Sequence, residues 1–482
     1  MAAIITEKFR LNNAKQFVED MGEAASSAYM FIGRSHSWTD DSTPPTPVDS
    51  PNDEFDAYRN MVAMKKISSS DISHAIVRRD WTSGTAYDEY RHNYTSANTS
   101  ANSKTTLWDS YFYVVTDDYN VYKCISNNNG GNSTQKPDHT TLATPTESDS
   151  YKWKFMYSIS ASDVIKFVTN DFVPVKTLGA KAAVDGNTGI GSTASDDGSA
   201  QWDTENGAAA GSIDHVRVVA GGTGYTASTS NTNKTIRGDG TGGVCTVTTN
   251  GSGVVSAVTV TTAGTGYSYA YVANDDIAGF DNANQRADGT NNSANIEFII
   301  GPKHGHGADA VSELGGNYVI LNSRLEFAEG AGDFPTDNDF RQIGVVVNPT
   351  NYGGTTVATA TTRAVVNKLT FNASGFSAPT VDTILRNAAT ETNASAVGVV
   401  TSVDTTNRII SYLPYPNEAG GFYAFSTSQT VYSGTSTNHG TISGLTNPEV
   451  GRHSGEVIYL ENRGAVSRAS DQIEDIKLIV EM

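Results

Sequence analysis

"IDHVRVVAGGTGYTAS", residues 213–228, returns in similar form as "VSAVTVTTAGTGYSYA" at residues 255–270. In both stretches a run of alternating apolar and polar residues leads into Gly-Thr-Gly-Tyr. Alternation with a period of two predicts a half-buried β-strand. Glycine tolerates the positive φ of a tight turn, and the tyrosine after it can fold back over the strand as a small core plug. The repeat therefore predicts a mainly β fold.

The glycines of the repeat also raise the possibility of a phosphate-binding loop. No helix is expected after either turn, and the spacing fits neither GxGxxG nor GxxxxGK[ST]. We therefore interpret the motif as structural. Its turn residues are Gly222, Gly224, Tyr225, Gly264, Gly266 and Tyr267.

The amino-acid composition and net charge exclude some classes of function. Of the 482 residues, 38% are hydrophobic and only 18% are charged, which leaves a large share of small polar residues and suits strands with many turns. The formal net charge of −19 argues against a nucleic-acid binder, which needs clustered Lys and Arg. It also disfavours adhesion to an anionic membrane.

The spacing of the two cysteines and the residues at the N-terminus indicate the compartment in which the protein is made. Cys124 and Cys245 lie far apart and lack CxxC partners, so we expect neither a disulfide framework nor a zinc site. The first residues lack the apolar core of a signal peptide, and no run is long enough for a membrane span. We expect a protein synthesised in a cytoplasm without membrane insertion.

Composition also divides the chain into five segments. Residues 178–296 and 351–447 are rich in small polar residues, and we predict that they are two inserted small β domains. Residues 1–177, 297–350 and 448–482 would form the N-terminal, central and C-terminal parts of one main body. The predicted fold is a β-sandwich main body with a few short helices, plus the two inserts. Because inserts sit at surface loops, we expect that replacing residues 178–295 with a short Gly/Ser linker leaves a soluble dimer with its main-body strands intact.

Two main-body stretches give specific local predictions. "EFDAYRNMVAMKKI", residues 54–67, predicts a helix that follows a Pro-rich loop at residues 39–53. "YKWKFMYSIS", residues 151–160, alternates and predicts a strand. The side chains expected on one face of that strand are Tyr151, Trp153, Phe155 and Tyr157.

The sequence offers few candidates for metal-binding or catalytic residues. His304 and His306, with Asp309 close by, form the best local metal candidate, but a third ligand at a diagnostic spacing is missing. We therefore favour a solvated turn and expect no metal and no cofactor. "GRHSGE" lacks the Gly-x-Ser-x-Gly spacing of a nucleophile elbow, and His453 and Ser454 would point to opposite faces of a strand. We expect no catalytic residues.

"RHSGEVIYLENR", residues 452–463, has apolar residues on both faces of its central strand. That pattern predicts a strand that is buried on both sides and carries charges at its ends. Buried charges need partners. We therefore predict that Arg452, His453, Glu456, Glu461 and Arg463 form an architectural packing and pairing cluster.

This stretch, followed by "DQIEDIKLIVEM" at residues 471–482, resembles the C-terminus of a phage protein family. The family is the baseplate wedge protein that is the eighth gene product of T-even-type contractile-tailed bacteriophages. Further matching segments occur in the same order in this chain: "EKFR", "FIGRSHSW", "AIVRRDW" with "YDEY", "YKWKFMYSI", "DFVPV" and "FRQIGVVVNP". The chain departs from the family in its two inserts and in Gly464-Ala465, where the family tends to have prolines.

The resemblance implies a structural protein of the virion tail baseplate, synthesised in the bacterial host cytoplasm. It implies a homodimer that contacts other wedge proteins and has no catalytic role. The structural or interface candidates that it and the residue patterns single out are Arg78, Arg79, Asp80, Trp81, Arg452, His453, Glu456, Tyr459, Glu461 and Arg463.

A receptor-binding or glycan-degrading tail protein is the alternative. Light Thr/Asn/Gly-rich β segments and 22 tyrosines would suit sugar contact. Such a protein would be expected to form a long β-solenoid or a trimer, and two repeats are too few for a solenoid. A dimer in solution would favour the wedge protein, and a trimer would favour a fibre or spike.

Overall fold

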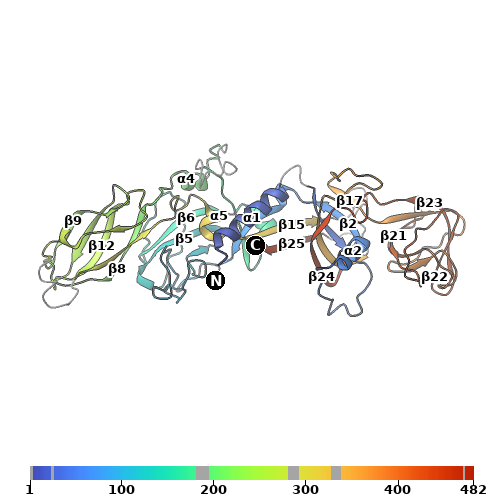
Figure 1. Cartoon of the computed structure of the whole chain (residues 1–482), viewed down its shortest axis with the longest axis horizontal. Coiled ribbons are helices and arrows are strands. Elements are labelled where there is room, and N and C mark those ends of the chain that lie inside the picture. Colours follow the sequence, from blue (N-terminus) through green and yellow to red (C-terminus); the bar gives the residue numbers. More distant parts are fainter. Residues whose placement is uncertain (1–3, 23–26, 181–194, 281–292, 327–337, 470–472) are drawn as a thin grey trace. The chain divides into compact units, whose positions relative to one another are not determined.

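The computed structural model describes residues 4–22, 27–180, 195–280, 293–326, 338–469 and 473–482 (Figure 1). The described part is mainly β, as the sequence predicts, with short helices between antiparallel strands. Among the described residues no helix is long and apolar enough to cross a membrane. Cys124 and Cys245 are both buried free thiols.

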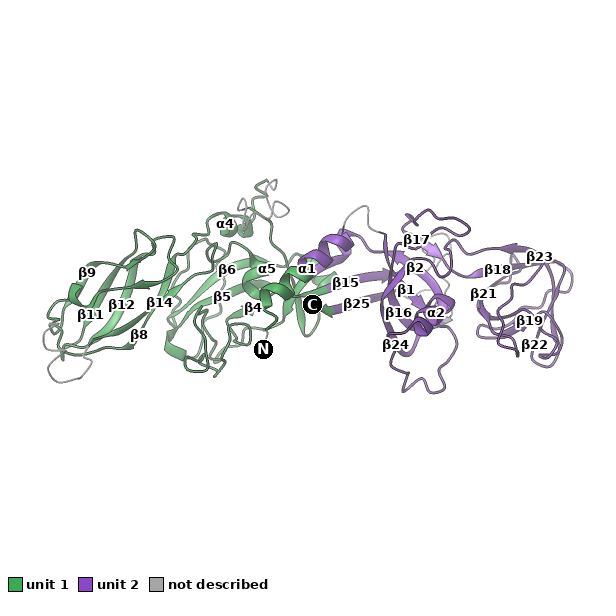
Figure 2. Ribbon diagram, viewed as in Figure 1, with its two compact units in different colours: residues 1–14, 74–319, 480–482 green, residues 15–73, 320–479 purple. Residues whose placement is uncertain are grey.

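The chain divides into two compact units (Figure 2). Unit 1 contains Met1–Ala14, His74–Val319 and Val480–Met482. Unit 2 contains Lys15–Ser73 and Ile320–Ile479. The predicted insert 178–296 falls in unit 1 and the predicted insert 351–447 falls in unit 2. The division into one main body with two inserts stays a prediction.

The described part of unit 1 contains three complete α-helices, and most of its strands form small antiparallel sheets. The helices are α3 (Ala161–Phe167), α4 (Ala200–Asn206) and α5 (Ala310–Leu314). Three pairs of strands are β3 (Ile72–Val77) with β7 (Phe172–Val175), β8 (Ile213–Ala220) with β14 (Asn295–Ile300), and β10 (Arg237–Gly238) with β13 (Ala270–Tyr271). One three-stranded sheet has the order β4 (Tyr113–Val115), β5 (Asn120–Asn127) and β6 (Tyr151–Ser158). The other has the order β12 (Val255–Thr262), β11 (Val244–Thr249) and β9 (Ser230–Thr235).

Strand β6 corrects one prediction. Tyr151, Trp153 and Phe155 pack in one buried cluster, but Tyr157 packs in another, so the four do not share one face. The reason is a β-bulge. Val121 of β5 pairs with Tyr157 while the next residue, Tyr122, pairs with Phe155, which leaves Met156 as an extra residue and reverses the faces beyond it.

The repeated stretches form the core of residues 213–300. Tyr225 and Tyr267 are each 4% exposed and belong to one cluster with Ile213, Val247 and Phe298. Burial of a phenol requires a partner for its hydroxyl. Tyr225 donates to the Asn274 side chain, and the Tyr267 hydroxyl donates to the Ile236 carbonyl at 2.9 Å. Each tyrosine therefore links its own turn to a distant segment.

Unit 2 is built on a five-stranded antiparallel sheet beside a closed barrel. The sheet order is β17 (Thr362–Ala364), β2 (Met61–Lys66), β1 (Ala28–Gly33), β16 (Asn338–Val347) and β24 (Glu456–Arg468). The barrel consists of β18 (Asn367–Phe371), β21 (Ile409–Tyr415), β20 (Val397–Asp404), β19 (Ile384–Arg386), β22 (Thr430–Ser433) and β23 (Thr437–Thr446). Four of the described elements cross the unit boundary: α1 (Glu7–Gly22), β3, β15 (Tyr318–Leu325) and β25 (Glu474–Glu481).

The predicted helix over residues 54–67 is wrong in its second half. Helix α2 runs from Pro51 to Asn60, and β2 begins at Met61. The helix begins inside the predicted loop because the Ser50 side chain accepts a bond from the Asp53 N–H and Pro51 fits the first turn. It ends because the apolar run after it is buried between β1 and β17 as a central strand.

The ends of the segment 351–447 lie together. Asn351 forms a β-bridge with Val450, and the Tyr352 N–H donates to the Glu449 carbonyl at 2.9 Å. Inside the barrel, Leu369, Leu385 and Ile410 are fully buried. A closed barrel leaves no free sheet edge, which suits a segment with few large side chains.

The turn glycines give a direct test of the repeat. Gly222, Gly224, Gly264 and Gly266 all have a positive φ. A Cβ on Gly264 would lie 2.6 Å from the Gly243 nitrogen, whereas one on Gly266 would meet nothing closer than 3.9 Å. We expect Gly266→Ala to cost about 1 kcal/mol from backbone strain alone, and Gly264→Ala to cost clearly more. Thermal denaturation of both variants measures this, and equal losses would contradict the assigned turn geometry.

Candidate functional site

The Arg78-Arg79-Asp80-Trp81 motif joins segments of unit 1. Arg78 pairs with Asp80 at 2.9 Å and donates to the Thr169 carbonyl at 3.1 Å. Asp80 forms a parallel β-bridge with Val115. The motif thus holds the end of β3 against two other stretches of the chain.

The other two side chains of the motif act in the same way. Arg79 donates to the Ser110 carbonyl, and its guanidinium lies over the rings of Tyr111 and Tyr113 at 4.7 and 4.8 Å. Trp81 donates to Ser133 Oγ at 3.2 Å and packs against an aromatic cluster. Because all four side chains are engaged within unit 1, their arrangement supports architecture.

The strand that contains "EVIYLE" corrects another prediction. β24 is the last strand of its sheet and pairs only with β16 among the described strands. Ile458 is 45% exposed, so the middle of the strand is not buried on both sides. Val346 pairs with Val457 and Val345 with Tyr459, which makes Ile458 the extra residue of a β-bulge. A bulge of this kind bends an edge strand and limits which chains can pair with it.

The charged residues around β24 do not converge. Arg452 donates to the Val365 carbonyl at 3.2 Å, and burial lowers its pKa to about 10. His453 packs edge-on against Phe55 and Tyr58, at 5.2 and 5.4 Å between ring centres. Burial lowers the pKa of His453. These two residues therefore contact different segments.

The acidic members of the predicted cluster lie apart from these basic residues. Glu456 is exposed, and Glu461 accepts a bond from the Tyr459 hydroxyl at 3.1 Å. The Arg463 side chain is exposed, and its main-chain carbonyl accepts a bond from Trp38 at 3.0 Å. The structure thus spreads the predicted residues along an edge strand instead of gathering them in one cluster.

Ser454 has a local structural role. Its hydroxyl accepts from the Thr350 N–H at 2.9 Å and donates to the Gly451 carbonyl. His453 has a positive φ in the same turn, which is uncommon for a residue other than glycine. The serine therefore stabilises a turn and is not paired with a base.

Among the described residues, His304 and His306 do not belong to any group of three or more potential metal ligands. His306 is not in a solvated turn either, because it is 6% exposed and packs edge-on against Tyr90. Burial lowers the pKa of His306 well below its usual value, so the ring is neutral.

His306 lies within a group of buried charges that composition does not reveal. Lys123 of β5 is fully buried and pairs with Glu313 of α5. Glu313 also accepts the Gly307 N–H at 2.9 Å. These bonds join β5, the His-Gly-His loop and α5, and they compensate two charges that burial would otherwise make very costly.

A second buried group surrounds Glu89. Glu89 is 4% exposed, and its carboxylate lies 3.2 Å from His215, 3.4 Å from Arg217 and 3.8 Å from Arg91. Burial raises the pKa of Glu89, but the hydrogen bond from His215 and the nearby charges outweigh it, so the pKa lies below its usual value. Arg217 also pairs with Glu297 at 2.9 Å.

The Lys123 group has one sequence signature that could have revealed it. Lys123 and Lys154 each interrupt an apolar strand, in "VYKCI" and "YKWKF". A lysine inside such a run is either exposed on one face or buried with a partner. Its partner cannot be deduced from the sequence, because Lys123 and Glu313 are distant along the chain.

Residues 3–135 match the family model described as bacteriophage T4 Gp8. This segment therefore carries the Gp8 family signature. The match confirms the resemblance predicted from the sequence over this range, which includes Arg78, Arg79, Asp80, Trp81 and Glu89. No curated protein gave a significant match.

The Gp8-matching segment supplies one side of both buried charge groups. Glu89 and Lys123 lie within it, whereas His215, Arg217 and Glu313 lie outside it. The part of the chain that matches the family is thus bonded to parts that do not match the family model.

The Lys123–Glu313 pair can be tested by removing charges singly and together. Lys123→Met leaves the Glu313 carboxylate buried without a cation and should cost about 3–5 kcal/mol. Lys123→Met with Glu313→Gln removes both charges and keeps an oxygen for the Gly307 N–H, so it should recover most of the loss. Chemical denaturation measures both variants. Full stability of the single variant would show that the pair is not buried.

Lys154 gives a pH-dependent test. Burial lowers the pKa of Lys154 to about 8 from the usual lysine value of 10.5, and the nearby Lys123 charge acts in the same direction. Between these values the unfolded chain binds more protons, so stability rises with pH. The stability of the wild type relative to Lys154→Met should rise from pH 8 to pH 10 and stay flat from pH 6 to 7.5. Exposed Lys8→Met is the control, and a flat difference at all pH values would contradict the burial of Lys154.

Proposed function

We propose that this protein is a non-enzymatic structural component of a phage baseplate wedge, which dimerises and bridges other wedge proteins during tail assembly and baseplate rearrangement on infection. The observation that carries this proposal is the match of residues 3–135 to the phage Gp8 family. Its location would be the tail baseplate of the virion, after synthesis in the bacterial host cytoplasm.

The arrangement of side chains supports this role. The charged residues of the Arg78–Trp81 motif bond within unit 1, and the buried Lys123 and Glu89 groups hold segments together. Ser454 bonds to main-chain groups. Side chains used in this way stabilise a framework, as a load-carrying assembly component requires.

Two strands supply surfaces for partner chains. β24 and β25 are each the last strand of a sheet. An edge strand exposes main-chain donors and acceptors, to which another chain can bond. The bulge at Ile458 restricts such pairing on β24 to partners of matching shape.

The molar mass in solution tests dimerisation. Light scattering after gel filtration should give twice the mass of the chain, and mixing with the other wedge proteins of the same phage should give a larger stoichiometric complex. A trimer that forms no complex with wedge proteins would instead favour a receptor-binding tail protein. So would hydrolysis of capsular or lipopolysaccharide glycans that is lost when one carboxylate is neutralised.

A further inference from the structure

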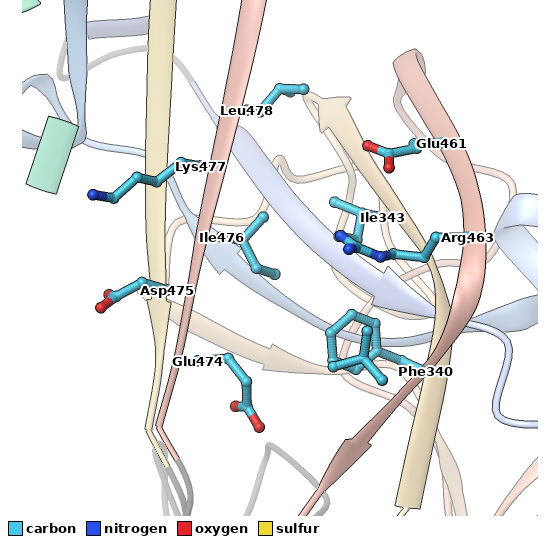
Figure 3. A pocket seen from close by; sticks show the side chains of 10 residues that line it. Phe340, Ile343, Glu461, Arg463, Glu474, Asp475, Ile476, Lys477 and Leu478 are labelled. Atoms are coloured by element: carbon cyan, nitrogen blue, oxygen red, sulfur yellow. The ribbon is translucent and has the colours of Figure 1, made fainter. Parts of the chain in front are cut away.

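An open groove lies in unit 2 between two sheets (Figure 3). Its walls come from β16 and β24 on one side and from β25 on the other. The volume of the groove is about 480 Å³, which falls within the usual range for ligand pockets of about 300–1,000 Å³. The groove thus has room for a few side chains.

The floor of the groove is apolar. Phe340 and Ile343 of β16 face Ile476 and Leu478 of β25 across it, and each of these four is less than a tenth exposed. Apolar side chains of packed sheets normally interdigitate, because a gap forfeits dispersion contacts. The gap between these two walls therefore favours entry of an apolar side chain from another molecule.

One cation points into the groove. Figure 3 shows the Arg463 side chain extending from β24 towards Ile343, whereas Lys477 extends on the other side of β25. Arg463 is exposed, and its guanidinium makes no hydrogen bond or ion pair with the residues that the structure describes. A free guanidinium fork matches the geometry of a carboxylate.

The three carboxylates at the groove have other partners than Arg463. Glu474 pairs with the buried Arg468 at 2.9 Å, and Asp475 lies 3.8 Å from Arg324. Glu461 accepts the Tyr459 hydroxyl at 3.1 Å. The unmatched group of the groove is therefore a cation beside an apolar floor.

The main chain beside the groove favours an extended occupant. β24 and β25 are both edge strands and both line the groove. An extended segment can bond to an edge strand through its main chain while alternate side chains enter a pocket. A helix or a compact surface would use neither feature.

We infer that the groove binds an extended segment of another protein in which a large apolar side chain is followed closely by Asp or Glu. The apolar side chain enters between Phe340, Ile343 and Ile476, and the carboxylate pairs with Arg463. The inference rests on the proposed function only in that it takes the partner from the same phage tail.

A peptide array provides the experiment. The probes are overlapping 15-residue peptides that cover the other baseplate proteins of the same phage and this chain itself, incubated with the full-length protein. Arg463→Glu reverses the charge at an exposed position and should leave the fold intact. Lys8→Glu makes the same charge change in unit 1 and is the matched control.

We expect the wild type and Lys8→Glu to bind a set of peptides that share an apolar residue followed by Asp or Glu. Arg463→Glu should bind that set at least about tenfold more weakly. Replacing the acidic residue of a bound peptide with Lys should abolish binding to the wild type and restore it to Arg463→Glu.

Three outcomes would overturn the inference. They are no binding above background, binding that Arg463→Glu leaves unchanged, and binding only to peptides of this chain, which would assign the groove to a second copy. None of them would affect the proposed baseplate role, because assembly of the wedge from whole proteins is measured separately.

Discussion

A buried carboxylate must be compensated, and Glu89 shows what this requirement imposes on unit 1. Its partners His215 and Arg217 lie on β8, inside the segment 178–296, whereas Glu89 lies in the part that matches the Gp8 family. The cost of leaving a buried charge unpaired is several kcal/mol. The two parts are therefore energetically coupled. A short linker in place of residues 178–295, which composition alone would favour as harmless, would strip Glu89 of two of its partners.

The same requirement explains why buried charged residues of this chain pair with one another and thereby hold segments of the fold together. Lys123 is compensated by Glu313, and the fully buried Arg468 by Glu474. Each pair joins elements that are distant along the chain or adjacent sheets. Arg463 differs, because its guanidinium is exposed at a groove and makes no ion pair with the described residues. A group of that kind is available to a partner.

Short sequence patterns predicted those features of the fold that depend on interactions between neighbouring residues. The mainly β class and the strand at residues 151–158 follow from side-chain alternation and residue composition, and the positive φ of Gly264 and Gly266 follows from the tight turns that the repeat requires. Bulges at Met156 and Ile458 were not predictable, because a single extra residue reverses a strand's faces without changing its composition. The exposure of β24 depends on its place at the edge of a sheet. Sequence alternation does not report that place. Likewise, the end of α2 at Asn60 depends on the neighbours of β2.

The most direct test of the structural role is a cryo-electron microscopy map of the intact virion at a resolution that traces strands. We expect density for the closed barrel of β18–β23 and for the five-stranded sheet of unit 2 within the tail baseplate, in contact with neighbouring baseplate proteins. Absence of this density from the baseplate, or its presence only in tail fibres or spikes, would contradict the assignment.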